Sequence, residues 1–456
     1  MIVLLWMVFS SGDPVQCKPT PIQSVRYFED YRDWSRTECH RGTLAELKRL
    51  MISENSSSFV SVGGQARLRW ERFTRESFGR IPTDDDGQLL YRSALHADLH
   101  LSAQWRVFAQ LRSAGIAGRE SGPRPFDEDR LDMHQLFLER RLRFADGALT
   151  LRLGRQESAR DFRLVSTRDW PNVRLAFDGA LISWERDEWV IDGYGALSVG
   201  ADDGVFDDFA SERTRLVYGL HATLRDEANS GTTFTLFYTG HTDSSPSGLR
   251  AVDREQRQSA GTDASVDLGA VDSAVELVLQ VGRSDGREIF AWFWALDAGV
   301  EGEWRQLGMR WESSFEAGSG DGDLGDGKLG TFNAFFPKNR YFAATGLVGA
   351  FSNALHVRNS AILTFKSLSL VGELEQFWRT SLQDAVFAPG GFPTLVALDS
   401  RERFIGHQID ARLSITLSRN LDAMIRYAHF FRGAHAKDAG VNGNTAFAAT
   451  QLRFRF

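Results

Sequence analysis

The chain has 456 residues, of which 42% are hydrophobic and 25% charged, and its formal net charge is -7 at pH 7. Nucleic-acid binding normally shows as a basic excess, so we expect no nucleic-acid partner. No Pro-, Ser- or Gly-rich linker divides the chain, which favours one large repetitive unit over several ordinary domains.

The basic residues are unusual in kind, because only six of the 53 are lysines, which leaves 47 arginines. Genomic base composition can produce such a bias. The physical alternative is that planar guanidinium groups are needed to bind carboxylates through two hydrogen bonds at once.

The first residues of the chain resemble a secretory signal. Residues 2–9 (IVLLWMVF) are apolar and are followed by small residues, although a positive segment before them is missing. We therefore expect 1–17 to be an atypical signal sequence. No later run approaches the roughly 20 apolar residues of a transmembrane helix.

Residues 18–58 form a polar segment. Leu44, Leu47 and Leu50 recur at helical spacing and predict a short helix over 43–51. Cys17 and Cys39 do not have metal-ligand spacing. We expect 18–58 to be a periplasmic segment or a plug-like element.

From residue 60 onward, apolar and polar residues alternate with a period of two. In the last strand, for example, Leu452, Phe454 and Phe456 fall on one face, while Arg453 and Arg455 fall on the other. The alternation runs over spans of about ten residues, the length that a tilted strand needs to cross a bilayer.

This alternation predicts an all-β fold over 59–456, a transmembrane antiparallel up-and-down β-barrel of about 18 strands closed by the C-terminal strand. The alternative for a single strand of this kind is the edge of a soluble β-sandwich. The predicted strands are 60–75, 88–101, 104–115, 131–145, 148–156, 177–186, 188–198, 212–225, 232–241, 255–267, 272–284, 287–300, 303–316, 354–366, 368–379, 402–418, 420–432 and 446–456.

The predicted connections alternate between tight links and long loops. Tight links include 102–103, 146–147 and 366–367, whereas 157–176 and 317–353 are long. This asymmetry is typical of the periplasmic and extracellular ends of an outer-membrane barrel.

Six runs of the chain resemble the bacterial alginate export family of outer-membrane barrels. They are GGQARLRWERF (63–73), GPRPFDEDRLDMHQLFLE (122–139), LTLRLGRQE (149–157), RLVSTRDWPNVRLAFDGA (163–180), GDGKLGTFNAFFPKNRYF (325–342) and GHQIDARLS (406–414). The resemblance implies an 18-stranded barrel in the bacterial outer membrane with an electropositive pore that conducts an anionic polysaccharide outward. It extends over nearly the whole chain.

The strand phase places many arginines on the inward face. We predict that the substrate-binding, pore-lining residues include Arg67, Arg69, Arg92, Arg112, Arg141, Arg152, Gln156, Arg310 and Arg412. A row of guanidinium groups can pass a polyuronate along without deep binding. The alternative for any one of them is an arginine–acid pair that braces a filled lumen.

Other chemistry is sparse, and we expect no cofactor, no metal ligands and no catalytic residues. Carboxylates cluster at 127–132 and 321–326, and we interpret the second, Gly-rich cluster as a solvated turn rather than a calcium site. His96 and His100 share a strand face but lack the further ligands that a metal site needs.

The sequence therefore predicts a channel for an alginate-like polyuronate, with an anionic polysaccharide or another anionic solute, outer-membrane lipid and periplasmic export components as partners. The first alternative is a porin for sugars or small anions. The others are an outer-membrane hydrolase with a Ser–His–acid group at the rim, and a structural barrel whose long loops close the lumen.

Overall fold

The computed structural model of the chain describes residues 21–32, 34, 43–53, 57–79, 87–124, 126–158, 163–210, 215–226, 231–244, 254–337, 351–388 and 393–456. The expected signal sequence, 1–17, lies outside these residues. None of the helices in the described ranges is long and apolar enough to cross a membrane.

Eighteen antiparallel strands of the described chain form one closed sheet, as predicted. They are β2 (Phe59–Thr74), β3 (Gln88–His100), β4 (Trp105–Ala117), β5 (Asp129–Phe144), β6 (Gly147–Gln156), β7 (Phe177–Arg186), β8 (Trp189–Ser198), β9 (Arg215–Asp226), β10 (Thr232–Asp243), β11 (Glu255–Asp267), β12 (Val271–Ser284), β13 (Arg287–Trp304), β14 (Leu307–Gly318), β16 (Ala354–Phe365), β17 (Leu368–Trp378), β20 (Phe404–Thr416), β21 (Leu421–Arg432) and β22 (Thr445–Arg455). Each strand pairs with its neighbours in this order.

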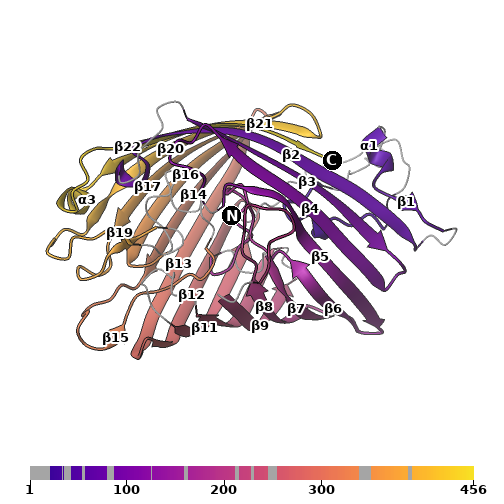
Figure 1. Cartoon of the computed structure of the whole chain (residues 1–456), viewed down its shortest axis with the longest axis horizontal. Helices are drawn as coiled ribbons and strands as arrows, with labels where there is room; N and C mark the ends of the chain where they lie inside the picture. The colour runs from indigo at the N-terminus through magenta and orange to yellow at the C-terminus, as the bar shows by residue number, and fades with distance from the viewer. Residues whose placement is uncertain are drawn as a thin grey trace.

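The first and last of these strands close the barrel. β2 pairs with β22 from Gln65 opposite Arg455 to Thr74 opposite Ala446, and Gly64 and Phe456 exchange two backbone hydrogen bonds of 3.0 Å. In Figure 1 the yellow C-terminal strands meet the indigo first strand at the top of the molecule. The prediction that the C-terminal strand closes the sheet is confirmed.

Short elements complete the fold: η1 (Arg26–Phe28), α1 (Thr43–Glu46), β1 (Leu50–Met51), α2 (Glu76–Gly79), β15 (Lys328–Leu329), β18 (Val386–Phe387), β19 (Pro393–Leu395) and α3 (Ala434–Asp438). The predicted helix over 43–51 is wrong in its second half, because Leu50 and Met51 pair with β2. The cause is that β22 ends with Arg455 opposite Gln65 and leaves the backbone at the start of β2 open on that side.

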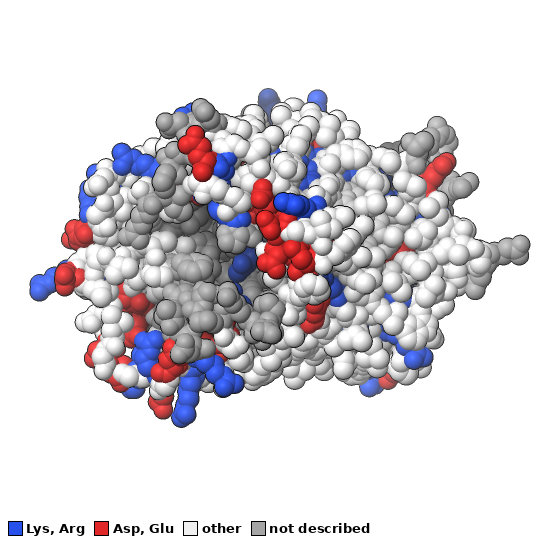
Figure 2. All heavy atoms as spheres, viewed as in Figure 1, with Lys and Arg blue, Asp and Glu red and all other residues white. Residues whose placement is uncertain are grey.

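The outer wall is apolar and the inner wall is polar. On β2, Leu68 is 51% exposed, whereas Arg67 and Arg69 on the opposite face are 3% and 1% exposed. Leu153 and Phe290 are likewise exposed, at 67% and 62%. The flank that carries β2 to β6 is largely white in Figure 2, where charged side chains are coloured. An apolar surface of this extent is suited to lipid.

The two ends of the barrel differ as predicted. Tight turns, such as those at 145–146, 305–306 and 366–367, lie at one end, and most connections at the other end are long. The predicted boundary between strands 287–300 and 303–316 is wrong, because β13 continues to Trp304. Arg305 and Gln306 then make the turn with positive φ values of 49° and 72°, the backbone conformation of a two-residue hairpin.

The solvated turn predicted at 321–326 is partly wrong. Asp323 and Asp326 are exposed and accept hydrogen bonds from backbone N–H groups two residues later. Asp321 is only 2% exposed, because its backbone N–H donates to a carboxylate oxygen of Asp384 at 2.8 Å, which draws this end of the turn into the fold.

Candidate functional site

The loop between β6 and β7 crosses the interior of the barrel. At one side Arg163 binds Glu276 on β12 at 2.7 Å and Asp297 on β13 at 2.7 Å. At the other side Asn172, which is fully buried, donates hydrogen bonds to the backbone of Tyr91 on β3 at 3.0 Å and of Gly115 on β4 at 2.9 Å. The segment 163–176, called the crossing loop below, therefore spans the lumen.

A second loop meets the crossing loop inside the barrel. The backbone N–H of Phe336 donates to Leu164 at 2.7 Å, and the N–H of Ser166 donates to Phe336 at 2.9 Å. Phe336 also packs edge-on against Phe177 at 5.2 Å, and Phe335 stacks on His241 at 4.4 Å. Apolar packing between these two loops and the wall thus fills part of the lumen.

Three of the predicted arginines hold the crossing loop. Arg67 donates to the carbonyl oxygens of Asp169 at 3.0 Å and Pro171 at 3.2 Å. Arg69 donates to the carbonyl of Trp170 at 2.6 Å and lies 4.2 Å from its ring. Arg92 binds the carboxylate of Asp169 at 2.8 Å. These guanidinium groups point inward, but the loop occupies much of their hydrogen-bonding capacity.

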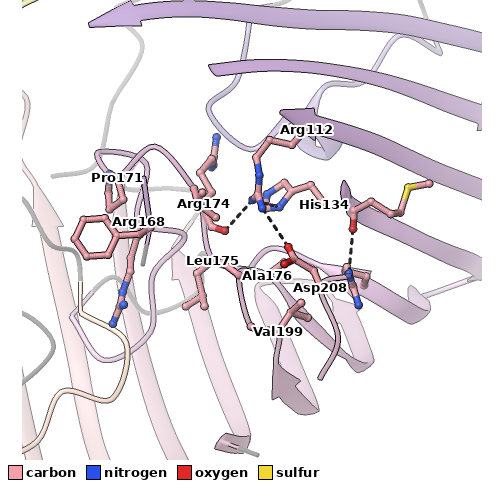
Figure 3. A pocket seen from close by; sticks show the side chains of 15 residues that line it. Arg112, His134, Arg168, Pro171, Arg174, Leu175, Ala176, Val199 and Asp208 are labelled. Atoms are coloured by element: carbon pink, nitrogen blue, oxygen red, sulfur yellow. Dashed lines mark hydrogen bonds and ion pairs between the residues drawn. The ribbon is translucent and has the colours of Figure 1, made fainter. Parts of the chain in front are cut away.

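Arg112 connects the wall to two loops. Its guanidinium lies 2.6 Å from Nδ1 of His134, donates to the carbonyl of Arg174 at 3.0 Å, and forms an ion pair with Asp129. A carboxylate oxygen of Asp208, in the loop after β8, lies 3.5 Å away. Figure 3 shows Arg112, His134, Arg174 and Asp208 close together at the cavity.

Arg152 and Gln156 lie on the inner face of β6. Arg152 pairs with Glu139 at 2.6 Å and lies 4.3 Å from the ring of Tyr27. Tyr27 lies in η1, within the polar segment 18–58, which is called the N-terminal segment below. Gln156 donates weakly to backbone carbonyls of β6 and β7, at 3.3 and 3.4 Å. Arg152 is therefore covered by the N-terminal segment rather than open to the lumen.

The other predicted arginines lie apart from this cluster. Arg141 pairs with Glu185 at 2.6 Å with 32% of its side chain exposed, near the tight-turn end. Arg310 lies among three carboxylates, those of Asp272, Glu301 and Glu312. Arg412 is half-buried on β20, directly opposite Arg426. The structure does not bring these three residues to the crossing loop.

A cavity of about 140 Å³ lies between the crossing loop and the wall. Four guanidinium groups are among its lining residues, those of Arg112, Arg155, Arg168 and Arg174, whereas Asp208 is the only carboxylate among them. A smaller cavity of about 20 Å³ also has Arg112 and Arg174 in its lining. The two cavities form the candidate site.

Arg168 is the least compensated of these cations. Its Nε donates to the carbonyl of Pro337 at 3.1 Å and its guanidinium lies 5.9 Å from the ring of Phe336, but no carboxylate in the described ranges pairs with it. Burial, together with the nearby charge of Arg215, lowers the pKa of Arg168 to about 10. A partly buried cation without a counter-ion would be stabilised by an anion in the cavity.

Two carboxylates beside the cavity are shifted in opposite directions. Burial raises the pKa of Asp208 to about 7, and the nearby Asp129 and Asp132 act in the same direction. Burial also acts to raise the pKa of Asp169, but Arg92 and Arg174 hold it well below its usual range. Asp208 thus gives the cavity an acidic edge, whereas Asp169 is a counter-ion of Arg174, which lines the cavity.

The sequence analysis missed Arg155, Arg168 and Arg174 as site residues. Arg168 and Arg174 lie in a loop without periodicity, so strand phase gives no indication of their direction. Arg155 follows Gly154, whose φ of 129° departs from ordinary strand geometry. The available signal was the run RLVSTRDWPNVR at 163–174, which contains three arginines in one predicted loop.

Comparison with known proteins gives both a family and a fold. The alginate export family matches residues 58–449. A search of curated proteins finds no match.

Solved structures share the fold at low identity. OccAB1 of Acinetobacter baumannii is 11% identical with a TM-score of 0.60, covering 90% of this chain and 99% of that one. A BenF-like porin from Pseudomonas fluorescens Pf-5 is 11% identical with a TM-score of 0.57, covering 87% and 98%. Pseudomonas aeruginosa OpdK, solved with vanillate, is 12% identical with a TM-score of 0.53, covering 87% and 98%.

The family and the fold are those of channels rather than of enzymes, and together with the closed barrel they place the protein in the bacterial outer membrane as a channel. The family match includes 17 of the 18 barrel strands in full and part of the last. The chain belongs to the alginate export family.

Proposed function

We propose that this channel conducts anionic solutes, with uronate-bearing saccharides as the substrate class, past the cationic cavity beside the crossing loop. The observation that carries the proposal is Arg168, a partly buried guanidinium with no carboxylate partner among the described residues, in a cavity that three further arginines line. A carboxylate entering this cavity would meet donors suited to two parallel hydrogen bonds.

The size of the cavity limits what can occupy it at one time. Its volume of about 140 Å³ is smaller than the roughly 300 Å³ of pockets that enclose a drug-sized ligand. One small anionic unit therefore fits without rearrangement, whereas a polymer requires the crossing loop or the N-terminal segment to move. OpdK, which shares the fold, was solved with vanillate, a small organic anion.

The predicted pore-lining arginines have two roles in this proposal. Arg67, Arg69 and Arg92 orient the crossing loop through its carbonyl oxygens and Asp169, and Arg112 faces the cavity. Their charges still act on a passing anion, because a narrow, partly desolvated passage screens charge less than an open surface does. Substrate contact by Arg141, Arg152, Gln156, Arg310 and Arg412 remains a prediction.

The experiment is planar-bilayer recording of the purified full chain. Reversal potential in a salt gradient is measured for the unaltered channel, Arg168→Ala and Arg168→Glu. The matched control is Arg186→Glu, because Arg186 is an exposed arginine paired with Asp146 at the tight-turn end. We expect anion preference that falls in Arg168→Ala, falls further in Arg168→Glu and is unchanged in the control.

Block by added saccharides separates the candidate functions. An oligouronate should reduce the current through the unaltered channel more than a neutral oligosaccharide of equal length does, and Arg168→Ala should weaken the block. Equal block by both saccharides would favour a general sugar porin, and no conductance would favour a structural barrel. Recovery of the oligouronate unshortened is expected for a channel without hydrolase activity.

A further inference from the structure

Three buried carboxylates converge at the loop-bearing end of β5. Asp129 and Asp132 come from β5, and Asp208 comes from the loop between β8 and β9. One oxygen of each lies within 4.8 Å of the other two, and the residues are 0%, 1% and 5% exposed. Charged groups so close together and away from water need compensation by opposite charge.

A local irregularity of the sheet creates this convergence. Residues three apart on a regular strand point to opposite faces. The pairing of β4 with β5 shifts register on both sides of Arg112, so that Arg112 lies opposite Asp132 and Ala114 opposite Asp129. Both carboxylates consequently point inward, which a regular strand would not allow.

Protein groups leave part of the cluster unsatisfied. Oδ1 of Asp129 and Oδ2 of Asp132 are buried and accept no hydrogen bond from the described residues. The neighbouring guanidinium of Arg112 is shared with His134, the carbonyl of Arg174 and Asp208. Arg112 thus pairs with two of the three carboxylates, Asp129 and Asp208, and Arg155 adds a more distant positive charge near Asp132 and Asp208. Two buried oxygen atoms of the cluster still have no donor among the described residues.

We propose that Asp129, Asp132 and Asp208 form a binding site for a calcium ion. All the available ligand atoms are oxygens, which suit a hard cation. An ion at about 2.4 Å from each oxygen, a usual calcium distance, can lie between atoms that are up to about twice that distance apart. The sequence predicted no metal site, because the loop residue Asp208 is separated from β5 by more than seventy positions.

The ion would fasten the β8–β9 loop to the wall beside the candidate cavity. Backbone hydrogen bonds already join the two at one point, since the N–H of Phe206 donates to Leu131 at 2.9 Å and the N–H of Leu131 donates to Gly204 at 3.4 Å. Asp208 also lines the cavity, as Figure 3 shows. Calcium would therefore fix one edge of the cavity and neutralise its carboxylate.

The test is calorimetric titration with calcium chloride of the full chain, refolded in detergent without lipopolysaccharide and treated with a chelator. We expect one calcium ion per chain with a Kd of roughly 10⁻⁴ to 10⁻³ M, as in extracellular calcium modules. Asp132→Asn and Asp208→Asn should each weaken binding about tenfold or more, because each removes one ligand charge. The matched control is Asp323→Asn, in an exposed turn, which should bind as the unaltered chain does.

Two results would overturn the proposal: no saturable binding by the unaltered chain, or equal affinities in Asp132→Asn, Asp208→Asn and the control. Heat-modifiable migration in gels reports whether each variant is folded. If the two Asn variants do not fold, hydrogen exchange of residues 199–210 in the unaltered chain decides. Calcium should slow this exchange relative to chelator, and exchange that does not change would equally refute the site.

Discussion

Arg26 donates a hydrogen bond from its guanidinium to the carbonyl oxygen of Phe456, 2.5 Å away and 430 residues later in the chain. The same side chain forms an ion pair with Glu29 at 2.7 Å, and both are almost fully buried. Tyr27 beside it donates through its hydroxyl to the carbonyl of Glu157 at 2.8 Å. The N-terminal segment is thus fastened both to the closing strand and to the start of the loop that crosses the lumen.

Arg26→Ala should release this segment and increase single-channel conductance. The substitution leaves the buried carboxylate of Glu29 without its guanidinium, and breaking a buried pair in this way costs about 3–5 kcal/mol. Conductance in planar bilayers is the measurement. Arg32→Ala is the control, because Arg32 pairs with Asp30 in the same segment but is exposed. Equal conductance of the two variants would contradict a plugging role.

Phe456→Asp should block assembly of the barrel. Phe456 completes the pairing with Gly64 at the closing seam. Its ring lies on the outer side by strand alternation, half-buried beside Phe454 and 5.9 Å from the ammonium of Lys48. A charge on this wall costs about 2–4 kcal/mol at mid-depth and less near the interface. Heat-modifiable migration in outer-membrane fractions measures assembly. Phe144→Asp, an exposed aromatic residue at the same end but away from the seam, should assemble, and normal migration of both variants would refute the prediction.

The barrel could be predicted because its signal is local. The alternation within each strand identifies its outer and inner faces, as Leu68 between Arg67 and Arg69 illustrates. This pattern can be read from the strand alone, without knowing its partners. Strand boundaries were less accurate, since the extension of β13 to Trp304 depends on a turn that Arg305 and Gln306 make without glycine.

The contents of the lumen could not be predicted in the same way. Alternation shows that Arg69 points inward, but it does not show that Arg69 binds the carbonyl of Trp170. That contact joins residues 101 positions apart. The same limit applies to Arg152 beneath Tyr27 and to Asp208 beside Asp132. Contacts between a wall and a loop depend on how the loop folds, and loops have no periodicity to reveal it.

Arg69→Met should destabilise the barrel more than Arg141→Met does. Arg69 lies 2.7 Å from Glu71 with both side chains at most 2% exposed. Its loss leaves this buried carboxylate with only the longer contact to Arg124 at 3.7 Å and a hydrogen bond from Gln88, and costs about 3 kcal/mol. Arg141 and Glu185 are 32% and 39% exposed, and their pair contributes about 1 kcal/mol at most.

The free energy of unfolding in urea, in detergent micelles, tests this contrast between the two pairs. The double variant Arg69→Met, Glu71→Gln should recover part of the loss, because it removes the buried negative charge that has lost its nearest cation. Equal losses for Arg69→Met and Arg141→Met would show that burial does not control the value of these pairs.

Lys48 should make the stability of the fold depend on pH above 8. Burial lowers the pKa of Lys48 from 10.5 to about 8, with Arg26 and Arg419 adding repulsion and Glu29 opposing them. Between these values the unfolded chain binds a proton that the folded chain does not, so stability rises with pH from about 8 to 10.5. Lys48→Met should remove this rise, on the order of 2 kcal/mol. Parallel curves for the free energy of unfolding against pH would contradict the prediction.

Asn172 should be the residue whose amide keeps the crossing loop in place. Its Nδ2 donates to the carbonyl oxygens of Tyr91 at 3.0 Å, Gly115 at 2.9 Å and Asp127 at 2.9 Å, and its Oδ1 accepts from Arg67 at 3.1 Å. No atom of the side chain is exposed. Asn172→Asp replaces the donor with an acceptor that faces three carbonyl oxygens, so repulsion is added to the loss of hydrogen bonds.

The loop should therefore leave the wall in Asn172→Asp, with a smaller effect in Asn172→Ala, which removes the bonds without adding charge. Trypsin cleavage at Arg168 and Arg174 measures release of the loop, and single-channel conductance measures its effect on the passage. Asn444→Asp is the matched control, because Asn444 is exposed and only accepts a hydrogen bond, from the N–H of Arg432, which a carboxylate can also do. If Asn172→Asp resists trypsin and conducts as Asn444→Asp does, the crossing loop is held by the arginines of β2 and β3 instead.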